Sequence, residues 1–135
     1  MCLDLGWKEH RIPLRTVRVA YKIVYADQRV GFLESLHFNF YFKPGWQKDR
    51  NRGRINIDDR HSYPTGFHVY TKQEDALSRA FRDEIVVRVK VRKIVVEGMQ
   101  LGLPTLVAKE IWFPKSTRRR QGYLDFPANE SLGLD

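Results

Sequence analysis

Three cations at alternate positions, Arg88, Lys90 and Arg92, form the pattern with the clearest chemical consequence in this sequence. Valines alternate with them over 87–91, so an extended strand would place the three cations on one face and the valines on the other. Alternate residues of a strand stand about 7 Å apart, which is close to the spacing of successive phosphates on one nucleic-acid strand. The pattern therefore predicts a row of cations suited to a polyanion.

Other basic and aromatic residues could extend this row or close around a ligand. Arg18 and Lys22 lie on the polar side of an earlier predicted strand. Further candidates are the loop cations Arg50, Arg52 and Arg54, the tail cations Arg118, Arg119 and Arg120, and the stacking residues Tyr41 and Trp46. The alternative is that these charges only solvate an exposed sheet face and keep its strands from aggregating.

His68 is the candidate for catalysis. It lies within 66–70, just before a predicted helix whose exposed amides would favour an anion. Glu110 could supply the base, as could Glu84 or Glu97. The alternative is a histidine whose hydrogen bonds are satisfied at the edge of the core.

The sequence contains no metal or cofactor motif. Cys2 is its single cysteine, and the nearest histidines, His61 and His68, are seven positions apart, which matches no zinc spacing. There is no phosphate loop, no dinucleotide-binding glycine fingerprint and no nucleophile elbow. We therefore expect no cofactor and no metal.

The composition supports an anionic partner for a single domain. The 24 Lys and Arg residues exceed the 16 Asp and Glu residues, which gives the 135-residue chain a formal charge of +8. Such an excess concentrates phosphates at a protein surface. The hydrophobic fraction of 42% is enough to fill one core and argues against disorder.

The sequence predicts a cytoplasmic protein that does not bind membranes. No apolar window is long enough to span a bilayer, and the N-terminus lacks the positive and apolar regions of a signal peptide. Cys2 can form no internal disulfide, which agrees with a reducing compartment.

Hydropathy patterning predicts mostly strands and one helix. Alternation or β-branched content predicts strands over 15–25, 31–42, 67–70, 83–96 and 105–113, and a short strand over 54–57 within an otherwise exposed loop at 46–60. The helix begins at Thr71, where Thr71 and Glu74 fit a capping box. Its apolar stripe would comprise Ala76, Leu77, Ala80 and Phe81.

This order of elements predicts an α+β domain. We expect a curved, mostly antiparallel sheet or partial barrel with one main helix packed on it. The globular domain would cover 1–114, and 115–135 would form a basic segment and C-terminal tail.

Several short motifs resemble those of a group of small uncharacterised proteins of bacteriophages and prophages. They are the MCL start, the early strand VAYKIV at 19–24, the GFHVYT turn at 66–71 before EDA at 74–76, and two late strands around Gly98. The resemblance covers most of 1–113 and implies a phage accessory product, with no mechanism attached. The sequence departs from that group at 95–98, where a proline-lysine-glycine turn would be expected, and in its more basic 48–54 loop.

Three function hypotheses follow from these observations. The first is a non-enzymatic phage accessory protein, with counter-defence as a natural role, that binds nucleic acid, a nucleotide or an acidic host protein through the basic sheet face. The second is a small enzyme acting on a nucleotide or nucleic acid through His68 and a glutamate. The third is a virion or assembly component whose basic tail contacts another subunit. We adopt the first as the leading hypothesis, because the basic strand face is the strongest physical signal in the sequence.

Overall fold

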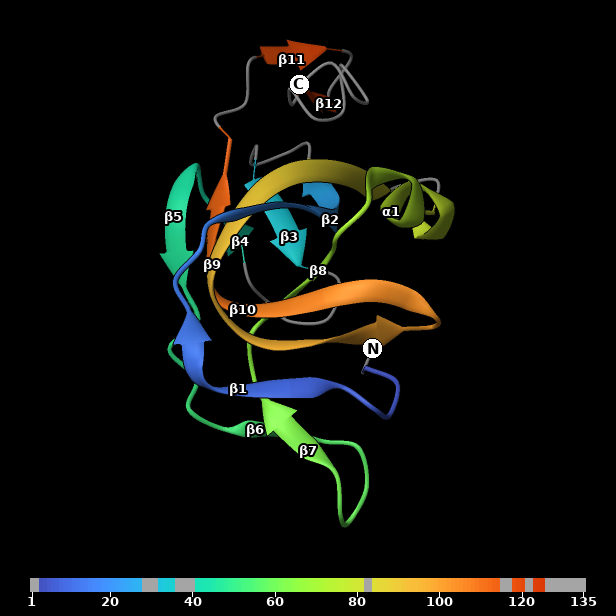
Figure 1. Ribbon diagram of the computed structural model, residues 1–135. Coiled ribbons are helices and arrows are strands. Elements are labelled where there is room, and N and C mark those ends of the chain that lie inside the picture. Colours follow the sequence, from blue (N-terminus) through green and yellow to red (C-terminus); the bar gives the residue numbers. More distant parts are fainter. Residues whose placement is uncertain are drawn as a thin grey trace.

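Antiparallel strands and one short helix make up the computed structural model of this chain (Figure 1). The structure describes residues 3–27, 32–35, 41–81, 84–114, 118–120 and 123–125, with backbone alone at 25–27, 32–35, 41, 118–120 and 123–125. The elements are β1 (Lys8–Leu14), β2 (Arg18–Asp27), β3 (Phe32–Ser35), β4 (Tyr41–Phe42), β5 (Gly45–Lys48), β6 (Arg54–Asn56), β7 (Ser62–Pro64), β8 (Phe67–Tyr70), α1 (Gln73–Arg79), β9 (Glu84–Gln100), β10 (Leu103–Phe113), β11 (Arg118–Arg120) and β12 (Tyr123–Asp125).

The long β9–β10 hairpin organises the sheet. The outer edge of β9 pairs with β2 along its first half and with β1 along its second half, while β10 pairs with β8 and then with β5. The pairings β9–β10, β10–β8, β8–β2 and β2–β9 form a circuit, but a single residue pair, Tyr21 with Tyr70, joins β2 to β8. The prediction of a curved, mostly antiparallel sheet with a helix is confirmed, whereas the sheet is not a regular barrel.

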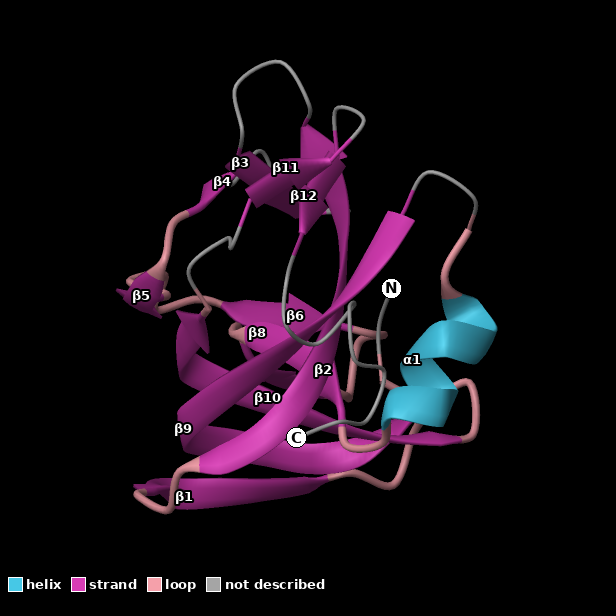
Figure 2. Ribbon diagram, turned by 90° about the horizontal axis from the view of Figure 1, so that it is seen from above, coloured by secondary structure: helices cyan, strands magenta, loops and turns pink. Residues whose placement is uncertain are grey.

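The β9–β10 hairpin bends sharply in its middle, as the arcs of both strands in Figure 1 show. Lys93 adopts a left-handed backbone conformation with φ of 56°. The register with β10 shifts by one residue nearby, which leaves Val95 as the extra residue of a β-bulge. In Figures 1 and 2, β5 beside this bend and α1 lie on opposite sides of the molecule.

The main core lies between the strands of this circuit and confirms the alternation predicted for the long strand. Val87, Val89 and Val91 are fully buried, together with residues of β2, β8 and β10. A second cluster packs β6, β7 and the N-terminal segment against the second half of the hairpin, around Tyr63 and Val107.

The helix is shorter than predicted and begins two residues later. Lys72 is its N-cap residue, and no side chain caps it, so the predicted capping box of Thr71 and Glu74 is wrong. The backbone N–H of Thr71 instead donates to the carbonyl of Pro104, which holds Thr71 outside the helix.

The predicted apolar stripe of the helix is confirmed only in part. Ala76 is fully buried against Ile23 and Val86, whereas Leu77 and Phe81 are 43% and 75% exposed. A helix of seven residues has room for one buried turn.

Five strands lie where no strand was predicted. The loop predicted at 46–60 in fact begins with β5, and β1, β7 and the two tail strands β11 and β12 were not expected either. Of these, β1 and β5 pair with the distant strands β9 and β10, whereas β7 pairs with the nearby β6, and β11 pairs with β12. The predicted strand at 31–42 corresponds to β3 and β4, and residues 36–40 lie outside the described part.

The side chain of Lys22 lies on the core side of β2. It stands opposite Val87 in the register and shares its face with Ala20 and Val24, which are fully buried. Its Nζ donates to the carbonyl of His68 at 2.9 Å. Burial lowers the pKa of Lys22 from 10.5 to about 8, because the charged form loses hydration.

Replacing this lysine should stabilise the protein at neutral pH. We expect Lys22→Met to raise the free energy of unfolding at pH 7 by roughly 1–2 kcal/mol, since it removes a desolvated charge at the loss of one hydrogen bond. Between pH 8 and 10.5 the wild-type lysine is neutral when folded and charged when unfolded, so wild-type stability rises with pH and the advantage shrinks. Urea unfolding from pH 7 to 10 measures both effects, with the exposed Lys72→Met as control. A variant less stable than wild type at pH 7 would contradict this account.

Candidate nucleic-acid interface

Arg88, Lys90 and Arg92 lie on the outer face of β9, opposite the buried valines. Lys90 is exposed, while Arg88 and Arg92 are half-buried. Arg88 lies nearest to α1 along the strand and already takes part in another interaction. The part of the row available to a ligand is therefore its Lys90–Arg92 end.

The register joins this end of the row to β10 and β5. Lys90 stands opposite Trp112, which in turn stands opposite Trp46. Two residues further along β9, Arg92 stands opposite Glu110, and Glu110 opposite Lys48. Directly opposite residues share a sheet face. Five of these residues form what we call the tryptophan–cation face: Lys48, Lys90, Arg92, Trp46 and Trp112.

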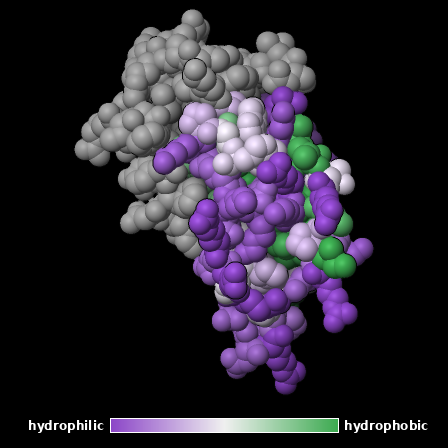
Figure 3. Space-filling view, turned by 90° about the vertical axis from the view of Figure 1, so that its left-hand side faces the viewer, coloured by the Kyte–Doolittle hydropathy of each residue, from purple (hydrophilic) through white to green (hydrophobic). Residues whose placement is uncertain are grey.

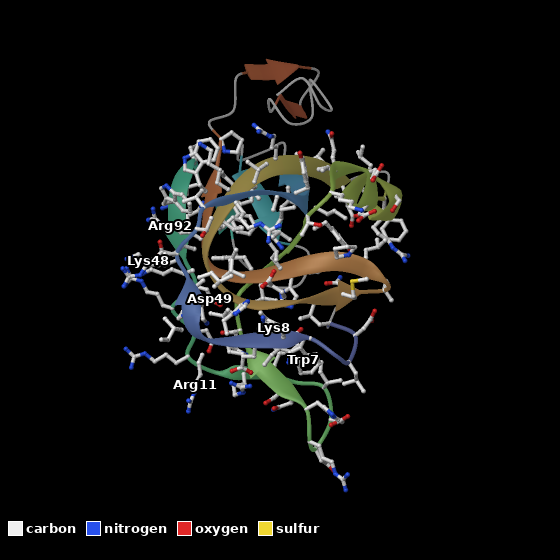
Figure 4. The ribbon with its side chains drawn as sticks, in the orientation of Figure 1. Trp7, Lys8, Arg11, Lys48, Asp49 and Arg92 are labelled. Atoms are coloured by element: carbon white, nitrogen blue, oxygen red, sulfur yellow. The ribbon has the colours of Figure 1, made fainter. Side chains whose placement is uncertain are left out.

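Each tryptophan of this face lies against a cation. The guanidinium carbon of Arg92 is 3.8 Å from the ring centroid of Trp46, and the Nζ of Lys90 is 4.7 Å from that of Trp112. Both distances are within the range of cation–π attraction. Trp46 remains 38% exposed. Figure 3 shows the side of the molecule that carries β5, where the described atoms are mainly hydrophilic, and Figure 4 places Arg92 and Lys48 on this side.

A buried carboxylate, Glu110, lies beneath the cations at the bend. It is 3% exposed and accepts hydrogen bonds from Nε of Arg92 at 2.5 Å and Nζ of Lys93 at 2.8 Å. Burial opposes its ionisation, but the hydrogen bonds and charges of Lys93 and Arg92 outweigh burial and hold the pKa of Glu110 below its ordinary value. A carboxylate paired in this way is a weak base.

Removing this charge should destabilise the bend. We expect Glu110→Gln to lower the free energy of unfolding at pH 7 by about 2 kcal/mol, because two cations lose their buried partner. The folded-state pKa of Glu110 is depressed, so its contribution is complete above the ordinary pKa of 4.5 and is lost as the pH falls through the folded value. Thermal unfolding of both proteins from pH 7 to 3 should show the difference in stability shrink once the pH falls below 4.5, with the exposed Glu74→Gln as control. A difference that stays constant from pH 7 to 3 would rule out the charge as its cause.

An open hollow of about 460 Å³ adjoins the tryptophan–cation face where the segment 49–53 meets the hairpin bend. The cations that line it are Lys48, Arg50, Arg52, Lys93 and Lys109. The structure thus brings the predicted loop residues Arg50 and Arg52 beside the cations of β5, β9 and β10.

Three of the predicted anion-binding residues lie elsewhere. Arg18 and Lys22 stand opposite Val91 and Val87, on the other face of the sheet, so they do not extend the row of cations. Arg18 is 3.6 Å from a carboxylate oxygen of Glu97. Arg54, on β6, is occupied by Glu9, with a distance of 2.7 Å between Nη2 and Oε1. The side chains of Tyr41 and of Arg118, Arg119 and Arg120 lie outside the described part.

His68 belongs to a hydrogen-bond network beside the second core cluster. Its Nδ1 is 3.2 Å from the carbonyl of Gly66, which only accepts, so Nδ1 carries a proton. In the neutral ring Nε2 then accepts from the hydroxyl of Tyr63 at 2.9 Å, and that hydroxyl accepts the backbone N–H of Leu3. Glu110, the candidate base, makes its hydrogen bonds to Arg92 and Lys93 at the hairpin bend. This arrangement favours a structural role for His68.

A structural role predicts a loss of stability on mutation. We expect His68→Ala to lower the free energy of unfolding by about 2 kcal/mol, because the buried Tyr63 hydroxyl loses its acceptor. Urea unfolding measures this, and the exposed His61→Ala provides the control. A stable His68→Ala protein that lost a nucleotide-modifying activity of the wild type would instead support the enzyme hypothesis.

Four residues of this region were not among the sequence-based candidates. Lys48 and Trp112 belong to the tryptophan–cation face, and Lys93 and Lys109 line the hollow. The sequence offered one usable signal for Trp112, because hairpin pairing of the two late strands places it near Lys90.

In the described part of the chain, no helix is long and apolar enough to cross a bilayer.

Comparisons of this chain with protein-family models, with curated proteins and with solved structures returned no match. The resemblance to phage proteins therefore stays a prediction.

Proposed function

We propose that this protein binds single-stranded nucleic acid on the tryptophan–cation face. One observation carries the proposal: two tryptophans and three cations lie on one face of three adjacent strands, and each tryptophan contacts a cation. Proteins that bind single strands without strong sequence preference combine cations for the phosphates with aromatic rings for the bases.

The cations of the face keep an excess of positive charge. Glu110 carries one negative charge against the two positive charges of Arg92 and Lys93. Within the described residues, neither Lys90 nor Lys48 forms an ion pair. Arg92 bonds to Glu110 through Nε, which leaves its two terminal nitrogens for phosphate oxygens.

The tryptophans supply the surface for bases. Trp46 is 38% exposed, and the guanidinium of Arg92 above its ring adds a flat cationic group on which a base can stack. Val19 of β2 stands opposite Lys90 on the same face and is 39% exposed, which extends the apolar area. Unpaired bases can reach such a surface, whereas bases stacked inside a duplex cannot. The predicted cytoplasmic location and phage accessory role are compatible with this proposal.

The proposal is tested by fluorescence anisotropy with labelled oligo-dT and oligo-U. We expect the logarithm of the affinity to fall linearly with the logarithm of the salt concentration, with a slope of about −0.7 for each phosphate contacted. Lys48→Gln should make this slope shallower by about one contact. Lys72→Gln, which removes an exposed lysine beside α1, on the opposite side of the molecule, is the matched control.

Stacking is tested separately in the same assay. We expect Trp46→Ala to weaken binding by at least about 5-fold, in line with the energy of one stacked base. Phe81→Ala removes an aromatic ring that is 75% exposed near α1 and should leave the affinity unchanged. Equal effects of the two aromatic variants, or binding that is indifferent to salt, would contradict the proposal.

A further inference from the structure

The hollow beside the tryptophan–cation face has a different chemistry from the face itself. It lies between the end of β5, the segment 49–53 and the bend of the β9–β10 hairpin. Its lining contains five cations and two carboxylates, Asp49 and Glu110, but no aromatic ring. Among the lining residues, Pro64 contributes the one apolar side chain. The hollow therefore suits a hydrophilic anion and offers nothing for a base to stack on.

Both carboxylates of the lining are already occupied. Glu110 is bonded to Arg92 and Lys93, and Asp49 accepts the backbone N–H of Asn51 and lies 3.7 Å from Nζ of Lys109. In contrast, Lys48, Arg50 and Arg52 are exposed and form no ion pair with any residue in the described ranges. The hollow thus keeps three cations that no carboxylate of the described residues neutralises.

The segment that carries Arg50 and Arg52 is held in place by its own polar groups. The side chain of Asn51 accepts the N–H of Gly53, and the carbonyl of Asn51 accepts bonds from Thr65 and from Nζ of Lys109. The N–H of Thr65 donates to the carbonyl of Gly53. A backbone that is ordered before binding loses little entropy when a ligand arrives.

We propose that this hollow binds the phosphoryl groups of a ligand, with Lys48, Arg50 and Arg52 contacting the phosphate oxygens. If the phosphate belongs to a nucleic-acid strand, this inference rests on the proposed function. The link is Lys48, which belongs to both the hollow and the tryptophan–cation face and lies two residues from Trp46. A strand whose base stacks at Trp46 brings a phosphate toward Lys48. A short inorganic polyphosphate presents the same oxygens and is the simplest probe.

Calorimetric titration with tripolyphosphate at low salt tests the site by itself. We expect binding by the wild type and at least tenfold weaker binding by the double variant Arg50→Gln/Arg52→Gln. The double variant Arg15→Gln/Arg60→Gln changes the net charge equally by removing two exposed arginines outside the hollow, and it should lose less than twofold. Thermal unfolding checks that both variants are folded. Equal losses in the two variants, or no binding by the wild type, would overturn the site.

Oligonucleotides with and without a 5′-phosphate then identify the source of the phosphate. If the hollow takes a strand terminus, the wild type prefers the phosphorylated strand and Arg50→Gln/Arg52→Gln loses that preference. If it takes a backbone phosphate, the variant weakens both strands equally. A third outcome is that Arg50→Gln/Arg52→Gln binds both oligonucleotides as tightly as the wild type while Trp46→Ala still binds them weakly. This result would show that the hollow is not part of the strand site, and it would leave the proposed function intact.

Discussion

The contact of Glu110 with Arg92 and Lys93 is the interaction on which the candidate interface depends. It lies where the β9–β10 hairpin bends and where Lys93 takes a left-handed conformation that costs a residue with a side chain about 1 kcal/mol. A buried carboxylate between two cations offsets that cost and also draws the cations to the same place on the surface. Because β5 pairs with β10 beside this point, Trp46 and Lys48 are brought to the same face.

The bulge at Val95 decides which residues share that face. Before the bulge, Val107 stands opposite Val96, and after it Ala108 stands opposite Ile94, so the register has moved by one residue. Without this shift Glu110 would stand opposite Lys93. Each residue of β10 from Ala108 onward would then pair with the neighbouring residue of β9, whose side chain lies on the other face. The alignment of Lys90 with Trp112 therefore depends on one extra residue near the bend.

The sequence was informative where a pattern is local and failed where a partner is distant. The alternation over 87–91 was sufficient to predict which side chains are buried, because period-2 patterning directly reflects the two faces of a strand. The strand β5 could not be predicted from Gly45–Lys48, since four residues of this composition become a strand only by pairing with β10. The face on which Lys22 lies also depends on a distant partner. Its polar type suggested an outer face, but its register with Val87 of β9 places it on the core side.

Net charge predicted an anionic partner but not its location, because location follows from which cations lack acids. Arg54 and Arg18 lie beside Glu9 and Glu97, so they contribute little to an external potential. At the bend, by contrast, one carboxylate serves two cations. A phosphate approaching Arg92 meets both the attraction of the guanidinium and the repulsion of Glu110 behind it. Glu110 thus acts in two opposed ways: it stabilises the bend that assembles the face, and it limits how tightly that face can hold an anion.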